Sequence, residues 1–522
     1  MKNYRALQNG SDIRGVALPD ASGKPVTLTP EAARDLSRAF AVWLASNRRL
    51  GPGPLTVAVG RDSRLSGEAL SRVVCESLRD FGVQVLDCGM ASTPAMFMST
   101  VFPEIAADGA VMITASHLPW DRNGFKYFSR AGGLEKQDIA DIVEIASAPD
   151  VSPGDASEGS WNSCDLMERY AAHLRQVVCR ELACPSEQNA LAGLRGVCDA
   201  GNGAGGFFVT HVLQALGADT SGSQFLEPDG RFPNHSPNPE DPEAMKSLSL
   251  ATYHAGADLG ILFDTDVDRS AAVDAAGHEI ARNRIVALAA SLISPEKEGS
   301  IIVTDSVTSD QLTLFLEEEL GFRHLRYQRG YRNVIGKALA LNAEDRDCPL
   351  AIETSGHAAF RENYFLDDGA YLATKIVIRA ARLKQEGMDI GSLIAKLQEP
   401  AEAMEVRIPV LAEGFSVYAD GIIQELRSLI ATGACTRESP CGGRCRCGMA
   451  VVEPNYEGIR VSCDEDNGDG WFLLRKSLHE PLLPLNIESN RPGGCGVIAK
   501  KVADLLDAYA ALDLKELRSL GA

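Results

Sequence analysis

The feature of this sequence that most constrains its fold is a repeated alternation between short apolar runs and longer helical stretches. In the first part of the chain, an apolar run at 55–60 is followed by a helical stretch at 66–81, and further apolar runs occupy 83–86 and 110–114. Apolar runs that end in turn signals and alternate with helices are typical of α/β domains. This part of the chain is therefore predicted to form an α/β domain.

The same alternation returns twice. A second unit opens with an apolar run at 196–199 and closes near 259–263, and a third opens at 301–304 and reaches 350–352 and a helix at 369–384. No sequence repeat accompanies the pattern. We therefore predict three related α/β domains with mixed sheets.

The pattern changes after about residue 400. A helix at 415–432, two strand-like runs and a final amphipathic helix at 497–517 predict a smaller α+β domain, while the Pro-, Ser- and Gly-rich stretch 146–160 predicts a linker. A chain of 522 residues has room for three or four domains of ~100–150 residues each. We place the domain boundaries at 1–160, 161–280, 281–400 and 401–522.

The charge balance restricts the partners. The chain has 51 basic and 71 acidic residues and a net charge of −20, which argues against nucleic acid or an anionic membrane as the main partner. The sequence contains no run of about 18 apolar residues, so it predicts no membrane span. Met1–Tyr4 lacks the apolar region of a signal peptide. We expect a cytoplasmic protein, or one of the plastid stroma if a transit peptide has been removed, that is a monomer or a homodimer.

The cysteines indicate a reduced, intracellular protein. Their number, 13, is odd, and most lie inside apolar runs. Four crowd into a Gly/Arg-rich stretch, at Cys435, Cys441, Cys445 and Cys447. Because their spacing fits no standard zinc pattern well, we interpret this stretch as a surface insertion, with a metal or redox site as the alternative.

A first polar loop follows the apolar run at 110–114. Ser116 lies just beyond this predicted strand, at the edge of the sheet where α/β domains place their ligands, and Lys126 returns a cation to the same neighbourhood. Taken alone, such a serine is more often a turn or capping residue than a functional one.

A second polar loop carries three carboxylates at alternating positions, Asp264, Asp266 and Asp268, directly after an apolar strand. Without a cation these groups would repel one another. Oxygen ligands of this kind suit a hard divalent cation such as Mg²⁺, although a solvated acidic turn is the simpler alternative. A second alternative, with Asp367–Asp368 further along the chain, is a haloacid dehalogenase phosphatase in which Asp264 is the nucleophile.

Two further loops offer groups for a sugar and a phosphate. Glu353 and Ser355, on a Gly-containing loop after a strand, suit adjacent sugar hydroxyls, since a site built to hydrogen-bond hydroxyls rejects analogues that lack them. Arg475 and Ser477 suit a phosphate dianion through charge-assisted hydrogen bonds. Each has a simpler alternative, a polar loop for the first and a salt-bridged strand end for the second. Basic patches at 61–64 and 329–332 add further cations.

The order of these four loops along the chain resembles the α-D-phosphohexomutase superfamily. Residues 11–15 (SDIRG) and 59–64 (VGRDSR) resemble its first two signatures, and residues 228–235 (PDGRFPNH) resemble its bacterial phosphoglucomutase/phosphomannomutase branch. The resemblance spans nearly the whole chain. It implies a heart-shaped enzyme of four domains, with one loop from each facing a central cleft.

The resemblance also implies roles for individual residues. Ser116 would be the phosphoserine and, with its phosphate, would bind Mg²⁺ together with Asp264, Asp266 and Asp268. The sugar hydroxyls would contact Glu353 and Ser355. Lys126 would be the general acid/base, with His357 as a second candidate. The remaining substrate-facing residues would be Arg14, Arg61, Arg269, Arg332, Arg475, Ser477 and His479.

The implied reaction moves a phosphoryl group between C1 and C6 of glucose or mannose through a hexose 1,6-bisphosphate, with glucose 1,6-bisphosphate as phosphate donor. The last loop departs from the family pattern Arg-Pro-Ser-Gly-Thr-Glu-Pro, because Lys476, Leu478 and His479 replace Pro, Gly and Thr. The departure leaves two alternatives open. One is a synthase that stops at glucose 1,6-bisphosphate, and the other is a weakly active sugar-phosphate sensor that uses the Cys-rich insertion.

Overall fold

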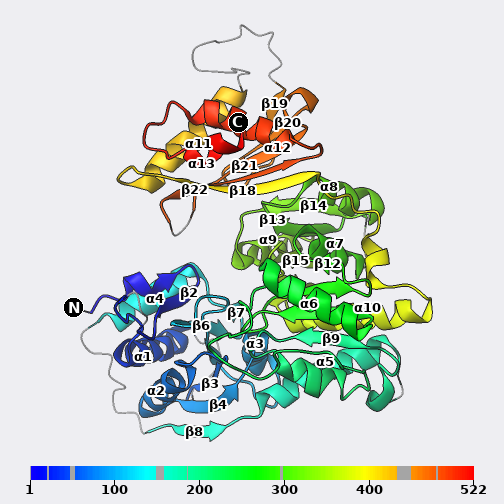
Figure 1. Ribbon diagram of the computed structural model, residues 1–522. Coiled ribbons are helices and arrows are strands. Elements are labelled where there is room, and N and C mark those ends of the chain that lie inside the picture. Colours follow the sequence, from blue (N-terminus) through cyan, green and yellow to red (C-terminus); the bar gives the residue numbers. More distant parts are fainter. Residues whose placement is uncertain are drawn as a thin grey trace. The chain divides into compact units, whose positions relative to one another are not determined.

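The computed structural model describes residues 2–19, 23–47, 53–148, 158–184, 186–293, 298–431, 448–477 and 480–521. The chain forms two compact units (Figure 1). Unit 1 comprises Met1–Ser294 and Pro349–Ala395, and unit 2 comprises Pro295–Cys348 and Lys396–Ala522. The Cys435–Cys447 insertion lies outside the described residues, as does most of the predicted linker.

Unit 1 begins with an eight-stranded mixed sheet of order β1-β2-β6-β5-β3-β4-β8, with β7 paired to β6. Its strands are β1 Gln8–Asn9, β2 Asp12–Val16, β3 Thr56–Arg61, β4 Gln84–Met90, β5 Gly109–Ile113, β6 Arg122–Ser129, β7 Gly132–Gly133 and β8 Ser160–Ser163. Its helices are α1 Pro30–Asn47, α2 Gly67–Asp80, α3 Thr93–Val101, α4 Lys136–Ala146 and α5 Leu166–Glu181.

The two faces of this sheet are covered by different helices. Val57 and Val59 of β3 and Val111 of β5 belong to a core that also contains the apolar faces of α1, α2 and α4. The intervening residues, such as Ala58 and Met112, are also buried, and α3 packs on β3, β5 and β6. Because both faces are covered, the central strands consist of continuous apolar runs. Such runs are easily recognised, so these strands could be predicted from the sequence.

The rest of unit 1 adds a four-stranded sheet, β12-β11-β10-β9, and a three-stranded antiparallel meander. The sheet contains β9 Gly196–Asp199, β10 Leu259–Phe263, β11 Ser270–Asp274 and β12 Glu279–Ile280, with helices α6 Pro242–Ala255 and α7 Asn283–Ser291. The meander contains β15 Leu350–Ile352, β16 Ala358–Phe360 and β17 Leu366–Asp367, followed by α10 Gly369–Gln385.

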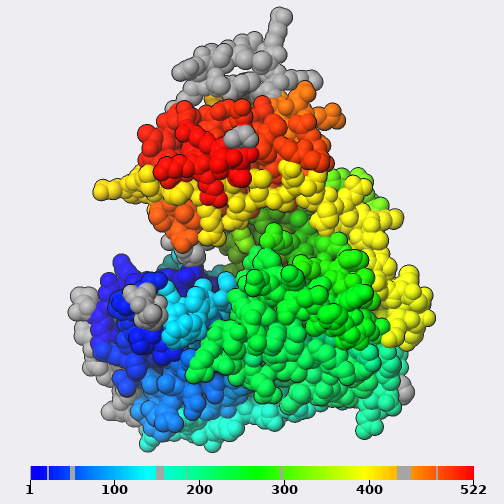
Figure 2. Space-filling view, in the orientation of Figure 1, coloured from blue at the N-terminus to red at the C-terminus, as the bar shows by residue number. Residues whose placement is uncertain are grey.

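Helix α10 joins the meander to the earlier parts of unit 1. It packs on β10, β11 and α5, and most of its residues are buried. Figure 2 shows the surface of residues 1–294, coloured from blue through cyan to green, which belong to unit 1.

Unit 2 contains a parallel pair of strands and a five-stranded antiparallel sheet, β18-β22-β21-β20-β19. The pair is β13 Ile301–Asp305 and β14 Arg323–Tyr327, with helices α8 Asp310–Leu314 and α9 Tyr331–Ala343. The sheet contains β18 Glu402–Pro409, β19 Met449–Val451, β20 Ile459–Cys463, β21 Gly470–Leu474 and β22 Leu482–Ser489. Helices α11 Phe415–Ala431 and α12 Gly494–Leu506 share one core with this sheet.

A buried arginine connects the sheet of unit 2 to the segment after β13. Arg460 stacks on the ring of Trp471 at 3.5 Å and donates hydrogen bonds to the carbonyl oxygen of Ser306 at 3.1 Å and to Asp310 at 2.9 Å. Arg460 thus joins strand β20 to the segment that follows β13.

The fold class is confirmed, with mixed-sheet α/β parts followed by a C-terminal α+β part.

The prediction of a single helix at 497–517 is wrong, since α12 ends at Leu506 and α13 spans Lys515–Leu520. Between them the backbone pairs with the end of β18, because Leu411 N–H donates to the carbonyl oxygen of Ala511 and Asp513 N–H donates to that of Pro409. In the described part of the chain, no helix is both long and apolar enough to cross a bilayer.

Candidate active site

Ser116 lies at the carboxyl end of β5, on a tight and strained turn. Its φ is +48°, a conformation that non-glycine residues adopt only where the surroundings enforce it. The side chain is buried, and its Oγ donates a hydrogen bond to Asp264 Oδ2 at 2.9 Å and lies 3.3 Å from His117 Nδ1. The turn thus holds the hydroxyl against the loop between β10 and β11.

Arg64 holds this turn in place, a role that sequence reasoning missed. Its guanidinium is almost completely buried and donates to the carbonyl oxygens of four residues of the serine loop. These four are Ser116, Leu118, Pro119 and Arg122. Asp62 supports the same turn, since it accepts a hydrogen bond from Thr114 Oγ1 at 2.7 Å while Thr114 Oγ1 accepts one from the Ser116 N–H at 2.8 Å.

The bacterial-branch motif at 228–235 packs against Arg64 from the other side. The ring of Phe232 lies 5.3 Å from the guanidinium carbon. A Cβ on Gly230 would lie 2.5 Å from the backbone of Ser63 and Leu65, so only glycine fits there. The motif therefore supports the serine loop indirectly, through Arg64.

Asp264, Asp266 and Asp268 lie in the turn between β10 and β11 and are all buried. One oxygen of each lies within 4.8 Å of the others. Asp266 Oδ1 and Asp268 Oδ1 are buried and have no hydrogen-bond partner. Burial, and then Asp268 and Asp266, raise the pKa of Asp264 well above its usual value. Orphaned carboxylate oxygens and mutual repulsion are what a bound cation relieves, so the triad fits a hard divalent metal ion.

Cations surround the triad. Lys126 Nζ contacts Asp266 Oδ2 at 3.0 Å and also pairs with Asp268. Arg269 Nε lies 3.3 Å from Asp264 Oδ2, and its NH2 group lies 3.5 Å from Ser116 Oγ. Burial alone would raise the pKa of Asp268, but Lys126, followed by His357 and Arg269, lowers it below its usual value.

Thr93, at the first turn of α3, fixes the central carboxylate of the triad. Its N–H donates to the carbonyl oxygen of Asp266 at 2.8 Å and its hydroxyl donates to Asp266 Oδ2 at 2.5 Å. The two residues are separated by 173 positions in the chain. Thr93 is a second residue that sequence reasoning missed.

The predicted sugar loop at 353–357 lies against the aspartate turn. Arg269 and His357 form an isolated antiparallel bridge, and Gly356 has a φ of +93° with its Cα so close to Ser270 that a Cβ would lie 2.6 Å from the Ser270 carbonyl oxygen. Glu353 and Ser355 are buried in the same loop. The backbone therefore fixes the sugar loop and the metal loop relative to each other.

The two histidines near the triad have opposite protonation. Burial, followed by the charges of Arg269 and Arg14, lowers the pKa of His117 to about 2, so this imidazole is neutral. For His357, burial lowers the pKa, but Asp367 and then Asp268 outweigh it and raise the pKa to about 9. His357 Nδ1 lies 2.5 Å from Asp367 Oδ2. His357 is therefore a cation at neutral pH. Asp367 was noted from the sequence as part of an acidic pair, but its contact with His357 was not predicted.

The other predicted residues of unit 1 lie nearby or at the edge. Arg14 donates to the carbonyl oxygen of Thr114 at 3.1 Å and to Asp12 at 2.7 Å, so it borders the serine loop. Arg61 is half-buried at the end of β3 and donates to the carbonyl oxygen of Asp62 at 3.4 Å. Among the described residues, no hydrogen bond or ion pair joins Arg61 to Ser116 or the triad.

The predicted phosphate loop belongs to unit 2. Burial, and then the charge of Arg329, lowers the pKa of Arg475. Ser477 Oγ accepts a hydrogen bond from the Glu480 N–H at 3.3 Å. Arg332 is in the first turn of α9, and His479 lies outside the described residues.

Lys476, which departs from the family pattern, points toward α11. Its Nζ lies 2.7 Å from Asp420 Oδ2 and 3.0 Å from Ser416 Oγ. The additional ammonium is therefore paired with a carboxylate of the same unit.

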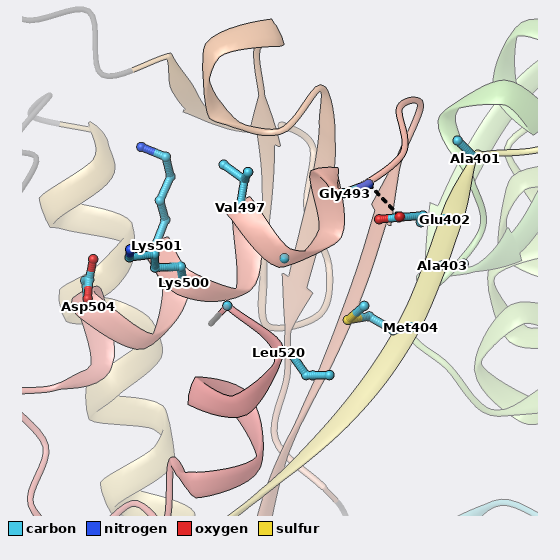
Figure 3. Close-up of a pocket in the computed structure, with 12 residues that line it drawn as sticks. Ala401, Glu402, Ala403, Met404, Gly493, Val497, Lys500, Lys501, Asp504 and Leu520 are labelled. Carbon is cyan, nitrogen blue, oxygen red and sulfur yellow. Dashed lines mark hydrogen bonds between the residues drawn. The ribbon is translucent and has the colours of Figure 1, made fainter.

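A separate pocket lies between β18, α12 and α13 (Figure 3). Glu402 accepts hydrogen bonds there from the N–H groups of Gly493 at 2.6 Å and Cys495 at 3.1 Å, and so caps the start of α12. None of the predicted site residues lines this pocket.

Comparisons with known proteins agree over nearly the whole chain. Three family models match it, described as phosphoglucomutase/phosphomannomutase α/β/α domains I, II and III, over residues 5–150, 168–277 and 281–400. The chain is 31% identical over 483 residues to the phosphomannomutase/phosphoglucomutase of Pseudomonas aeruginosa, covering 92% of this chain and 90% of that protein. It is 34% identical over 482 residues to the phosphomannomutase of Salmonella montevideo, covering 88% and 91%.

A solved structure of a phosphoglucomutase/phosphomannomutase family protein from Burkholderia thailandensis matches with a TM-score of 0.76 at 26% identity, covering 98% of this chain and 99% of that one. A structure described as a putative phosphomannomutase from Thermus thermophilus matches with a TM-score of 0.66 at 19% identity, a likeness of fold.

Proposed function

Because the chain belongs to the phosphoglucomutase/phosphomannomutase family, we propose that this hexose phosphate mutase works through a phosphorylated Ser116. The enzyme class follows from the relatives, which favour a mutase over a haloacid dehalogenase phosphatase or a sensor. The observation that carries the proposal is the hydrogen bond from the Ser116 hydroxyl to Asp264, a member of the buried carboxylate triad.

In the proposed cycle, phospho-Ser116 gives its phosphoryl group to the free hydroxyl of a hexose monophosphate. The bond between phosphorus and Ser116 Oγ breaks, the bond to the sugar oxygen forms, and the hydroxyl proton passes to a base, for which Lys126 is our first candidate. The resulting hexose 1,6-bisphosphate turns around, and its other phosphate returns to Ser116. Storing the group on a serine divides one difficult exchange into two transfers.

The neighbouring cations suit this chemistry. Arg269 lies against Ser116 Oγ, and His357 is positively charged at neutral pH, so both can neutralise the phosphate oxygens as the phosphoryl group moves. His357 therefore serves this role better than that of a base. We assign the sugar hydroxyls to Glu353 and Ser355, whose loop is fixed against the aspartate turn.

Mg²⁺ is the cation that we assign to Asp264, Asp266 and Asp268. When bound, it neutralises charge on the phosphoryl oxygens of phospho-Ser116 and of the substrate. The hydrogen bond from Thr93 holds Asp266 in position for this role, and the orphaned oxygens of Asp266 and Asp268 provide two ligands.

Mg²⁺ should stabilise the protein through this triad. With protein freed of divalent cations, we expect saturating Mg²⁺ to raise the free energy of unfolding by roughly 2–3 kcal/mol, the amount that a ligand at ~100 times its Kd contributes. Asp266→Asn should lose most of this increment, measured as a shift in Tm. The control Asp80→Asn, on the surface of α2, should keep it. Equal Mg²⁺ shifts in wild type and Asp266→Asn would contradict the metal assignment.

The phosphate that is not reacting is assigned to Arg475 and Ser477. The effect of the Arg329 charge on the pKa of Arg475 supports this assignment, because an anion stabilises positive charges that act on each other. Lys476 is already paired with Asp420. We therefore expect it to contribute little to the phosphate.

The proposed function is tested by following phosphate on Ser116 with mass spectrometry. We expect purified protein with Mg²⁺ and glucose 1,6-bisphosphate to carry one phosphate on Ser116, and to pass it on when glucose 1-phosphate is added, with glucose 6-phosphate as the product. Phosphate that leaves only as glucose 1,6-bisphosphate would support the synthase alternative. An active protein whose Ser116 is never phosphorylated would overturn the proposal.

A further inference from the structure

Two cysteines that the mutase reaction does not use lie side by side in unit 1. Strands β4 and β8 pair in parallel, with Asp87 opposite Ser163. Cys88 and Cys164 are the next residues along these two strand segments, and Cys164 N–H donates to the carbonyl oxygen of Asp87 at 2.8 Å. Both are free cysteines, and the Cys88 thiol donates to the carbonyl oxygen of Leu86 at 3.5 Å.

The spacing of these residues suits a disulfide. Neighbouring strands lie about 4.7–4.9 Å apart, within the ~4.4–6.8 Å between Cα atoms that a disulfide spans. Cys88 is also the additional residue of a β-bulge, because Val59 pairs with Asp87 whereas Gly60 pairs with Gly89. A bulge is a place where a strand can adjust locally.

The two thiols differ in exposure and in acidity. Cys88 is buried, whereas Cys164 is half-exposed just before the first turn of α5. The neighbouring Cys88 thiol, whose effect outweighs that of burial, lowers the pKa of Cys164 to about 7, and Arg169 adds to this effect. The Cys164 side chain, followed by burial, raises the pKa of Cys88 and keeps this thiol protonated. Cys164 is therefore the thiol that attacks first, and Cys88 is the thiol that reacts in the second step.

We propose that Cys88 and Cys164 form a reversible disulfide by exchange with a low-molecular-weight disulfide such as oxidised glutathione. The Cys164 thiolate attacks one sulfur of glutathione disulfide, forming a mixed disulfide and releasing one glutathione. Cys88 then attacks Cys164 Sγ and loses its proton, which releases the second glutathione. Two protein thiols are oxidised and one small disulfide is reduced to two thiols, so electrons and protons balance.

The disulfide would connect two segments that both reach the active site. β4 leads to Thr93, which holds Asp266, and α5 carries Tyr170, whose hydroxyl donates to Asp368 at 2.6 Å. Asp368 adjoins Asp367, the partner of His357. The proposal concerns the thiols alone and does not depend on phosphorylation of Ser116.

The sequence makes this disulfide easy to detect, because trypsin separates every other cysteine from the pair. Residues 80–122 contain Cys88 as their single cysteine, and residues 137–169 contain Cys164 as theirs. After incubation of the full-length protein with oxidised glutathione at about pH 8, we expect these two peptides to appear linked in most molecules and to separate on treatment with dithiothreitol.

Single variants test the order of the two steps. In Cys88→Ser, we expect glutathione to remain on Cys164 and no linked peptide to form. In Cys164→Ser, modification of Cys88 should be at least about tenfold slower, because its thiol is buried and protonated. The control Cys179→Ser removes a half-exposed cysteine that lies on α5, away from the pair. This variant should form the linked peptide at the wild-type rate.

The pH dependence provides an independent measurement. The rate of linkage should rise roughly tenfold per pH unit below the pKa of Cys164 and level off above about pH 7. Absence of the linked peptide in wild type would overturn the proposal. So would glutathione that persists on wild-type Cys164 as long as it does in Cys88→Ser.

Discussion

Ser116→Ala should reduce the rate of hexose phosphate isomerisation by a factor of about 10⁴–10⁶, the scale seen when a nucleophile is removed from an otherwise intact site. Alanine keeps the backbone turn but removes the Oγ that contacts Asp264. Conversion of glucose 1-phosphate to glucose 6-phosphate, measured with a coupled assay, reports this loss.

Two readouts separate the loss of the nucleophile from damage to the site. The stabilisation of Ser116→Ala by Mg²⁺ should persist, because the aspartate triad is unchanged. The control Ser46→Ala, at an exposed position of α1, should keep full activity. A Ser116→Ala enzyme that retains more than about a hundredth of the wild-type rate would revive Asp264 as the nucleophile, since a site without its nucleophile should retain far less.

Substituting Arg64 should have the largest effect on stability. Arg64→Leu leaves Asp62 buried without its cation and four carbonyl oxygens without their donor. Breaking a buried ion pair from one side costs about 3–5 kcal/mol. We expect denaturant unfolding to show a loss of that size, and isomerisation to fall at least about 100-fold, because a displacement near 1 Å of a reacting group costs that much.

Arg64→Lys separates charge from geometry at this position. A lysine restores the charge beside Asp62 but offers a single ammonium, which cannot reach carbonyl oxygens that a planar guanidinium contacts on several sides. It should recover part of the stability and little of the activity. The control Arg79→Lys, on the surface of α2, should change stability by less than about 0.5 kcal/mol. Wild-type activity in Arg64→Lys would show that the guanidinium does not position Ser116.

The sequence located the buried strands well and the interactions between distant segments poorly. The strands predicted at 196–199, 259–263 and 350–352 match β9, β10 and β15, because strands covered on both faces consist of uninterrupted apolar residues. The carboxyl ends of such strands are where α/β proteins place ligands. This rule is sufficient to predict Ser116 and the three aspartates as site residues from the sequence.

The residues that sequence reasoning missed act through tertiary contacts. Arg64 belongs to a stretch that resembles a basic surface patch, and nothing local indicates that its guanidinium turns inward. Thr93 contacts Asp266 across 173 residues, and Asp367 was noticed only as part of an acidic pair. The split of the last helix likewise results from pairing between 409–411 and 511–513, a contact that helical periodicity cannot reveal.

The return of the chain to unit 1 has a consequence for folding during synthesis. α10 covers β10, β11 and α5, but it follows Pro295–Cys348, which belongs to unit 2. At ~5–20 residues per second, the ribosome needs several seconds to synthesise that insertion, and for this time the apolar surface that α10 will cover is exposed. The nascent chain is therefore most vulnerable to aggregation and to chaperone capture in this interval, after the nucleophile and the metal ligands have been synthesised.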